Sequence, residues 1–477
     1  MSNLYFERRK NHDQERNSYD NYCDRSENFR QGGEHMLRIE ATVQLNLCEA
    51  LLPRQVFELN EELAKVSDLL DDSAITKPFI DEFAQTKGRP TVPVQTYLRL
   101  MYLKFRYQLG YEALVKEVSD SLMWRTFCRI SLDAKVPDAT TLIKLTHKYG
   151  DTTIEALNEA LVNRAVNDKV VRGRKLRVDT TAVESDIDYP TDAGLIAKGV
   201  RTITREVKKL KASGEDVGTF KNRTRSLKYR VLEIAKHSRR RTGDKVTEVR
   251  SIVGRMAKAA KSVVAEAEAI LGSDLNSAQH KKLARAVDLT KKIIEQAQKV
   301  AEGAPIENRV VSLADEDARP IPKGKRVVEF GYKTILTETE ERIIIDYDCL
   351  IGNPSDDSLL EDTLTKSKKK LGRAPRAVAA DRGFASSAND TMCCELGIKK
   401  ISIPRKGRLS KKRRQHQKQR WFKRLQRFRA GGEATISLLK RKYGLKRTRL
   451  RGHAGAKIWV GWSVLTYNLR RLSSLTG

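Results

Sequence analysis

Long apolar runs, thiol motifs and histidine clusters are missing from this 477-residue sequence. No run approaches the roughly 18 apolar residues that a membrane helix needs, and the N-terminus has no signal-peptide core. The six cysteines form no CxxC pair and the seven histidines are scattered, which argues against a zinc site or a disulfide framework. These absences predict a reduced, soluble, cytoplasmic protein that does not enter a membrane.

Acidic residues are scarce relative to basic ones. The chain has 61 Asp and Glu against 92 Lys and Arg, which gives a formal net charge of +31. Such an excess repels itself in a compact monomer, so we expect a polyanionic partner. Nucleic acid is the leading candidate and an anionic membrane surface is the second. Because RNA-binding proteins share this charge, it indicates a class of partner and no reaction.

The length is sufficient for two or three domains with a sizeable core. Residues 1–35 are polar and aperiodic, which predicts a disordered leader. Met36 follows it, so the sequence leaves open whether translation starts at Met1 or at Met36. Residues 36–170 are expected to form a helical domain. This domain is either a plain helical bundle or, given the charge, a DNA-binding domain.

Helix signals support that domain. An apolar stripe at helical spacing begins at Val94, and Gly110 is the expected C-cap at its end. Asp138 and Asp151 each precede a helical pattern and are predicted N-caps.

A basic helical insertion follows the first strand of the next domain. The segment RKLRVDTTAVES (Arg174 to Ser185) is β-branched and predicts that strand. Residues 193–303 return to a helical pattern rich in Lys, Arg and Ala. Between residues 201 and 261 there are 19 basic residues and 6 acidic ones. The two-faced pattern predicts coiled-coil-like hairpins with a solvated face.

The remaining sequence predicts one mixed sheet with flanking helices. Two antiparallel strands, RVVEFGYKTILT and ERIIIDYDCLIG, are separated by a turn at Glu338-Thr339-Glu340. An amphipathic helix, the strand RAVAAD, a helix ending near Gly397 and the strand KKISIP follow. This order is typical of an α/β fold, which assigns residues 171–192 and 304–477 to one domain.

Asp381 ends a short apolar strand in the stretch VAADRGF, where Arg382 and Gly383 follow it. One interpretation is ordinary turn chemistry, because aspartate and glycine favour turns. The other is a ligand at the end of a strand, where neighbouring elements present side chains to one site.

Asp179 lies inside the first predicted strand, LRVDTTAV. A carboxylate on the buried side of a strand is costly unless it is paired or bound to a metal. The alternative is an aspartate on an exposed edge.

Glu433 begins a predicted helix that runs to about Tyr443. Lys440 is seven residues later, so the two side chains share a face, and Arg429 precedes the glutamate by one turn. The pattern fits either a plain helix salt bridge or a carboxylate and cations at a phosphate. Two-metal phosphoryl transfer needs two or three converging carboxylates, and Mg²⁺ takes oxygen ligands without Cys or His.

Several of these motifs together resemble bacterial insertion-sequence transposases of the DDE class. They are LRVDTT, AVAADRGF and FRAGGEATISLLKRKYGLKRTRLRGHAGAKIWVGWSVLTYNLRRL, with GRPTVPVQTYLRLMYLK resembling the family's helical N-terminal domain and SLADEDARPI resembling its entry to the second core strand. The resemblance covers residues 85–190 and 307–472. It implies a ribonuclease H-like core in which Asp179, Asp381 and Glu433 are catalytic and hold two Mg²⁺ ions, for which Mn²⁺ can substitute. It also implies transposon-end and target DNA as partners, a homo-oligomer that is a dimer on DNA, and a location at the nucleoid when DNA is bound.

The resemblance is incomplete in two places. Arg429, Glu433 and Lys440 fit the family's tyrosine, arginine, glutamate and lysine pattern, but the tyrosine position is Gln426. The helical insertion does not map onto the family.

A basic block from Arg405 to Arg429 holds 13 Lys and Arg and no acid. It is either a solvated, disordered loop or a surface that contacts DNA phosphates. On the second interpretation, the predicted DNA-binding residues are Arg413, Arg414, Arg420, Lys423 and Arg424, together with Arg429 and Lys440.

Three functions remain open at this point: a DNA transposase that cleaves element ends and joins the 3′-OH to target DNA, a non-catalytic domesticated DNA-binding relative, and a metal-dependent nuclease without strand transfer. The intact acids favour the first. The sequence leaves open the terminal repeats, the target preference, a hairpin or another cleavage route, the oligomeric state and the role of the insertion.

Overall fold

The computed structural model of the chain describes residues 35–36, 38, 51–80, 89–237, 243–272, 278–323, 327–405 and 407–475. All but the last residue of the predicted leader, 1–35, lies outside the described residues. The chain divides into two compact units, one made of Met1–Glu184 and Lys333–Gly477 and the other of Ser185–Tyr332. In the described part, no helix is long and apolar enough to cross a membrane.

The first unit contains the helices that the sequence predicted before the first strand. They are η2 (Arg54–Phe57), α3 (Glu61–Leu70), α4 (Ser73–Ile80), α5 (Val94–Tyr107), α6 (Tyr111–Asp120), α7 (Leu122–Cys128) and α8 (Ala139–Asn167), with the two-residue strands β1 (His35–Met36) and β2 (Arg89–Pro90) paired in parallel. Asp138 is the N-cap of α8, as predicted. The left-handed backbone of Gly150 (φ 71°) breaks α8 directly before Asp151, where the second helical pattern was expected to begin.

The predicted C-cap at Gly110 is wrong. α5 ends earlier, with Gln108 in the left-handed region (φ 56°), and Gly110 is instead the N-cap of α6. The side chain of Gln108 donates a hydrogen bond to the carbonyl oxygen of Arg441 at 2.7 Å. The backbone N–H groups of Gln108 and Leu109 both donate to the carbonyl oxygen of Lys104, so α5 closes two residues before the glycine.

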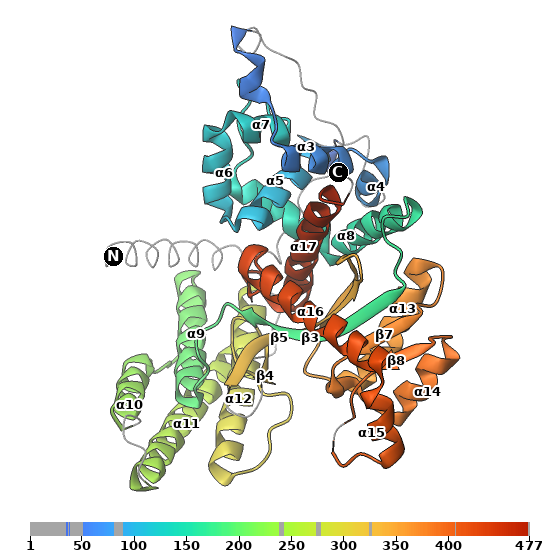
Figure 1. Cartoon of the computed structure of the whole chain (residues 1–477). Helices are drawn as coiled ribbons and strands as arrows, with labels where there is room; N and C mark the ends of the chain where they lie inside the picture. The colour runs from blue at the N-terminus through green and yellow to red at the C-terminus, as the bar shows by residue number, and fades with distance from the viewer. Residues whose placement is uncertain are drawn as a thin grey trace. The chain divides into compact units, whose positions relative to one another are not determined.

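The C-terminal helix α17 (Gly452–Ser473) packs against α3, α5, α8 and strand β6 (Ile344–Leu350) of the same unit (Figure 1). Its indole rings lie in the core, where Trp459 and Trp462 contact the ring of Phe105 and Trp462 contacts Tyr97. The last helix of the chain therefore shares a core with both the N-terminal helices and the sheet.

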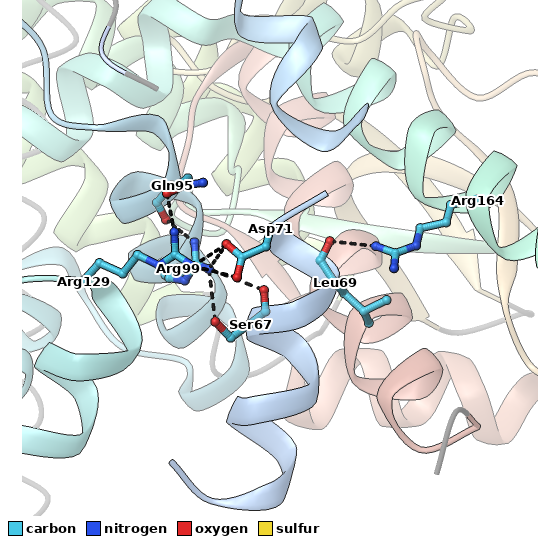
Figure 2. A network of polar contacts seen from close by, with 7 residues as sticks. All are labelled: Ser67, Leu69, Asp71, Gln95, Arg99, Arg129 and Arg164. Atoms are coloured by element: carbon cyan, nitrogen blue, oxygen red, sulfur yellow. Dashed lines mark hydrogen bonds and ion pairs between the residues drawn. The ribbon is translucent and has the colours of Figure 1, made fainter. Parts of the chain in front are cut away.

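A buried polar network ties α3 to α5 and to the end of α7 (Figure 2). The fully buried guanidinium of Arg99 donates to Asp71 at 2.7 Å and to Ser67 at 3.1 Å. Arg129 pairs with both carboxylate oxygens of Asp71 and donates to the side chain of Gln95. Two arginines thus share one carboxylate, which compensates for the burial of Arg99.

The mixed sheet that the sequence predicted is present in the first unit. Besides β6 its strands are β3 (Lys175–Ser185), β5 (Val327–Thr339), β7 (Ala377–Ala380), β8 (Lys400–Ser402) and β9 (Arg447–Thr448). The order is β6, β5, β3, β7, β8, with β9 also paired to β3. β3, β7 and β8 are parallel, whereas β5 and β6 are antiparallel.

The predicted turn at Glu338-Thr339-Glu340 is placed too early. β5 runs through Thr339, and the chain turns only before β6 begins at Ile344. Glu338 and Thr339 are buried, and Glu338 forms an ion pair with Arg177 of β3. A polar sequence that usually marks a turn is here held in a strand by a partner on a neighbouring strand.

Helices surround this sheet, and the one that carries Glu433 is longer than predicted. They are α13 (Leu360–Leu371), α14 (Ser387–Glu395), α15 (Lys411–Lys418) and α16 (Arg420–Lys442), with the short helices η3 (Asp356–Leu359) and η4 (Arg382–Phe384). The sequence predicted that the helix carrying Glu433 starts at that residue, but α16 begins at Arg420. The buried side chains of Phe422 and Leu425 show why, because they give its first turns an apolar face.

The second unit is mainly helical, as predicted for residues 193–303. It contains α9 (Asp192–Ala212), α10 (Thr224–His237), α11 (Gly243–Leu271) and α12 (Ala278–Glu302), followed by β4 (Arg319–Lys323), which pairs with the first residues of β5. The helices have their own apolar core, which includes Ile203, Val207, Met256, Val263 and Leu283.

Candidate active site

Asp179 and Asp381 are neighbours across two strands of the sheet. In the parallel pair β3 and β7, Val178 is the partner of Ala380, and each aspartate is the next residue along the chain. Asp381 directly follows the last residue of β7, whereas Asp179 lies inside the longer β3, at the level where β7 ends. The electrostatics agree, since the charges of Asp381 and Glu433 both act on Asp179.

Asp179 is mostly buried, with 19% of its side chain exposed. Burial raises the pKa of its carboxyl to about 6, and the neighbouring charges of Asp381 and Glu433 add to this effect. The guanidinium of Arg429 and the backbone N–H of Thr180, which donates at 2.9 Å, act in the opposite direction. The net rise shows that these two groups do not fully compensate for the buried charge.

Asp381 itself is exposed at the start of η4, where one carboxylate oxygen accepts a hydrogen bond from the backbone N–H of Arg382. Part of the turn interpretation therefore holds, because Asp381 does cap a short turn. This capping hydrogen bond involves one of the two carboxylate oxygens of Asp381.

Arg429 of α16 links Glu433 to Asp179. Its guanidinium lies 2.9 Å from a carboxylate oxygen of Glu433 and 3.5 Å from one of Asp179. Glu433 is largely exposed, whereas Arg429 is mostly buried. The arginine thus holds an acid of the helix beside an acid of the sheet, and the plain helix salt bridge is only part of its role.

A buried ion pair fixes α16 on the sheet. Arg177, two residues before Asp179 on β3, pairs with Glu338 of β5, and both side chains are almost fully buried. Thr435 of α16 donates to Glu338 at 2.8 Å, and Arg177 donates to the carbonyl oxygen of Phe428 at 2.9 Å. These contacts flank Glu433 on both sides along the helix.

Two glycines allow this close approach. A Cβ atom at Gly431 would lie 2.7 Å from the guanidinium of Arg177, and one at Gly432 would lie 3.3 Å from its Cδ. The pair GG that precedes Glu433 is therefore the place where the helix backbone passes over Arg177. Sequence reasoning missed both Arg177 and Glu338, and the glycine pair was the available signal.

A second cluster, also missed, contacts residues next to the two aspartates. The carboxylate of Asp356 accepts a hydrogen bond from Thr180 at 3.1 Å and pairs with Lys333 at 2.7 Å. It also lies against Gly383, where a Cβ atom would be 2.4 Å from its oxygen. Asp356 thus contacts the residue after Asp179 and the turn after Asp381.

The ligand chemistry at this edge suits Mg²⁺, because every candidate ligand is a carboxylate. The incompletely compensated charge of Asp179 also favours a nearby cation. In the described residues, however, no three Asp, Glu, His or Cys side chains are placed to hold one ion together. Arg429 contacts oxygens of both Asp179 and Glu433, so a metal and this guanidinium would compete for them.

The basic block is helical for most of its length, which contradicts a disordered loop. α15 and the first half of α16 form most of it, and Ser410 caps α15. A groove of about 600 Å³ runs along α16, and its lining includes Lys423, Arg427 and Arg429. The block is therefore continuous with the candidate site through Arg429.

The predicted DNA-binding residues differ in their surroundings. Arg414, Arg420, Lys423 and Arg424 are exposed. Arg413 is half-buried and pairs with Asp390 at 3.3 Å, so it already has an acidic partner.

Lys440 and Gln426 lie on α16 on either side of Glu433. Lys440 is half-buried in the last turn and shares a face with the glutamate on the seven-residue spacing. Gln426, at the family's tyrosine position, donates to the carbonyl oxygen of Ser402 at 2.6 Å and so attaches α16 to β8.

Comparison with known proteins gives two family matches. Residues 52–148 match a transposase domain of the DUF772 family, and residues 286–469 match a transposase DDE domain. The second match includes Asp381 and Glu433, whereas Asp179 lies outside both. A protein of Rhizobium meliloti described as "Uncharacterized protein ORF8 in nfe locus" is 29% identical over 133 residues, which is 27% of this chain. The chain covers 64% of that protein's length, and no solved structure matches.

Proposed function

This chain belongs to the insertion-sequence transposases of the DDE class, and from that premise we propose that it cleaves DNA at the ends of an insertion sequence and joins the freed 3′-OH to target DNA. The observation that carries the proposal is that Asp179 of β3 and Asp381, directly after β7, are neighbours across these two strands, with Glu433 held beside Asp179 by Arg429. The sheet order β6, β5, β3, β7, β8 supports a ribonuclease H-like core.

In this proposal Asp179, Asp381 and Glu433 are the catalytic acids and would hold Mg²⁺, or Mn²⁺ in its place. When bound, these ions would generate the attacking nucleophile and stabilise charge at the scissile phosphate. Arg429 keeps two of the acids together beforehand. Arg177 and Glu338 position α16, and Asp356 packs against the turn that follows Asp381.

The partner is DNA, both as element ends and as target. The exposed cations at the start of α16 supply phosphate contacts next to the acids, which fix the position of the duplex and carry no sequence information. A dimer on paired ends is part of the proposal, because joining two ends to one target requires two sites.

The decisive experiment incubates the full chain with Mg²⁺ and DNA that carries the flanking repeats of its own gene, and maps the cut. Asp179→Ala, Asp381→Ala and Glu433→Ala are each expected to abolish cleavage and to leave DNA binding nearly intact, because each removes a metal ligand. Asp362→Ala is the matched control, since Asp362 is an exposed acid on α13 that pairs with Lys366. It should cleave like the parent.

The outcomes separate the alternatives. Binding without cleavage by the parent chain would indicate a domesticated DNA-binding relative. Cleavage without joining of the 3′-OH to a second DNA would indicate a nuclease. Retained cleavage in one of the three variants would remove that residue from the catalytic set.

A further inference from the structure

The second unit carries a basic groove along α9, which we call the α9 groove. It has a volume of about 480 Å³, and its lining residues lie on α9 and in the segment that leads into α10. Its lining residues are Arg201, Thr204, Arg205, Lys208, Lys209, Ala212, Asn222 and Thr224. Every charged residue in this lining is a cation, and the only apolar one is an alanine.

Three of these cations form a row. Arg201, Arg205 and Lys208 are exposed and follow each other by four and three residues, which places them on one face of α9. The row extends over about 10.5 Å at 1.5 Å per residue. One strand of duplex DNA presents a phosphate about every 3.4 Å along the axis, so the row spans roughly three phosphates. The opposite face of α9 is buried in the unit's own core.

Two of the three cations of the row, Arg201 and Lys208, are available to a ligand. Arg205 and Lys209 both contact Glu206, whose side chain is buried, so this one acid holds two cations at the groove. In the described part of the chain, neither Arg201 nor Lys208 forms an ion pair with an acid. The side chains of Asn222 and Thr224 add neutral polar groups on the other wall.

We propose that the α9 groove binds the phosphate backbone of duplex DNA, so that the helical insertion is a second, sequence-independent DNA-binding surface. The choice of DNA among polyanions rests on the proposed function. An anionic membrane would also attract the charge, but the lining has no large apolar side chain that could enter a bilayer.

The test measures the binding of the full chain to a duplex of arbitrary sequence, without divalent metal, over a range of salt concentrations. The variant Arg201→Ala/Lys208→Ala removes two cations from the row. Lys258→Ala/Lys261→Ala is the control, because it removes two exposed cations from α11, outside the groove. All four changes lie on helix surfaces and introduce a good helix former, so both variants should fold. Equal circular dichroism and unfolding midpoints check this.

Each phosphate contact contributes about 0.9 to the slope of log affinity against log salt, so the groove variant should lose about 1.8 from the slope. Between 50 and 200 mM salt, the ratio of parent to variant affinity should therefore shrink about twelvefold. The control should keep the parent slope. Equal slopes for parent and groove variant, or an equal loss in the control, would overturn the proposal. So would a selective loss of binding to phosphatidylserine vesicles with an unchanged DNA slope.

The result is separable from the proposed function. A parent chain that binds DNA and loses slope in the groove variant, yet never cleaves with Mg²⁺, supports the groove and contradicts the transposase activity. If the parent chain cleaves DNA and the groove variant keeps the parent salt slope, the transposase activity is supported and the role of the α9 groove is contradicted.

Discussion

At the scale of single residues, Arg429 joins two acids of the proposed site. It contacts both Asp179 and Glu433, one from the sheet and one from its own helix. An arginine between two carboxylates reduces their repulsion and holds them close together. In the proposed reaction, a metal ion would take over the carboxylates, and the guanidinium of Arg429 could then bind a DNA phosphate. Arg429 would therefore have a role both before and after DNA binds.

Lys440 is the residue for which binding and cleavage should separate. If it contacts a phosphate of the element end, Lys440→Ala should lower the salt slope of binding by about one unit. Cleavage should fall further, since misplacing the scissile phosphate by about 1 Å can cost roughly a hundredfold in rate. Glu433→Gln should keep binding and lose cleavage. Single-turnover cleavage and binding titrations on the same DNA measure both effects.

The matched control is Lys442→Ala, which removes an exposed cation two residues later on a different face of α16. It should leave the cleavage rate unchanged. If Lys440→Ala keeps both the parent slope and the parent rate, Lys440 has no part in holding the DNA.

At the scale of elements, the buried pair Arg177 and Glu338 decides where α16 lies. Arg177→Ala should destabilise the first unit by about 3 to 5 kcal/mol, because it leaves the carboxylate of Glu338 buried without its main partner. Cleavage should fall as well, since the contacts that flank Glu433 depend on Arg177. Urea unfolding followed by tryptophan fluorescence measures the stability, because all four tryptophans lie in the first unit.

The double variant Arg177→Leu/Glu338→Leu separates position from stability. With no charge left buried, it should recover much of the free energy of unfolding. It should not recover cleavage, because α16 still lacks its attachment through Arg177. Full cleavage in the double variant would show that the pair has no role in positioning Glu433.

The structure of the basic block determines which variants can test its binding to DNA. Removing residues 408–427 would delete α15 and the buried Phe422 and Leu425, and would therefore disturb the fold as well as the charge. Substituting the exposed cations Arg414, Arg420, Lys423 and Arg424 by alanine leaves the helices in place. If all four contact phosphates, the salt slope of binding should fall by about 3.6 units on any duplex.

Arg413→Ala is the internal comparison for that variant. Arg413 already pairs with Asp390, so its loss should change the salt slope by much less than one unit. If the variant with four alanine substitutions keeps the salt slope of the parent, the exposed cations of the block face solvent and DNA binds at another surface.

At the scale of the molecule, Glu62 connects α3 to both α5 and α17. It pairs with Arg106 at 2.6 Å and with Arg470 at 2.7 Å, and Tyr102 donates to it at 3.0 Å. Partial burial raises its pKa, but the hydrogen bonds and charges of these partners outweigh burial, so the net pKa lies below the ordinary value of 4.5.

Because folding lowers this pKa, the stabilisation by Glu62 is complete above about pH 4.5 and is lost as the pH falls through the folded-state value. Glu62→Gln should therefore cost about 1 to 3 kcal/mol at pH 7. The difference from the parent should shrink at more acidic pH. Urea unfolding of parent and variant at pH 7 and at a more acidic pH measures the free energy of unfolding of each. If the difference between the two proteins is the same at both pH values, the charge of the Glu62 carboxylate contributes nothing to stability.

The sequence by itself determined the order of helices and strands, the mixed sheet, and the positions of Asp179 inside the first strand and of Asp381 at the end of a later one. Local patterns carry this information: β-branched runs, helical spacing and acids next to turn residues lie within a few residues of each other. The same local reasoning placed the start of α16, the end of α5 and the turn after β5 incorrectly. At each of these boundaries the structure has contacts that a local pattern does not contain. The first turns of α16 bury Phe422 and Leu425, the side chain of Gln108 donates to Arg441, and Glu338 pairs with Arg177.

Only the tertiary structure decided which side chains support the acids. Arg177 and Glu338 are 161 residues apart in sequence, and Thr180 and Asp356 are 176 apart. The pair Gly431-Gly432 signals a close approach to α16 but does not tell which side chain approaches. The partners of these buried charges are brought together only by the folding of the sheet. The roles of Arg429 and of the α9 groove follow in the same way. The spacing in the sequence predicts that cations share one face of a helix. Only the fold shows which cations pair with an acid and which cations remain available to a phosphate.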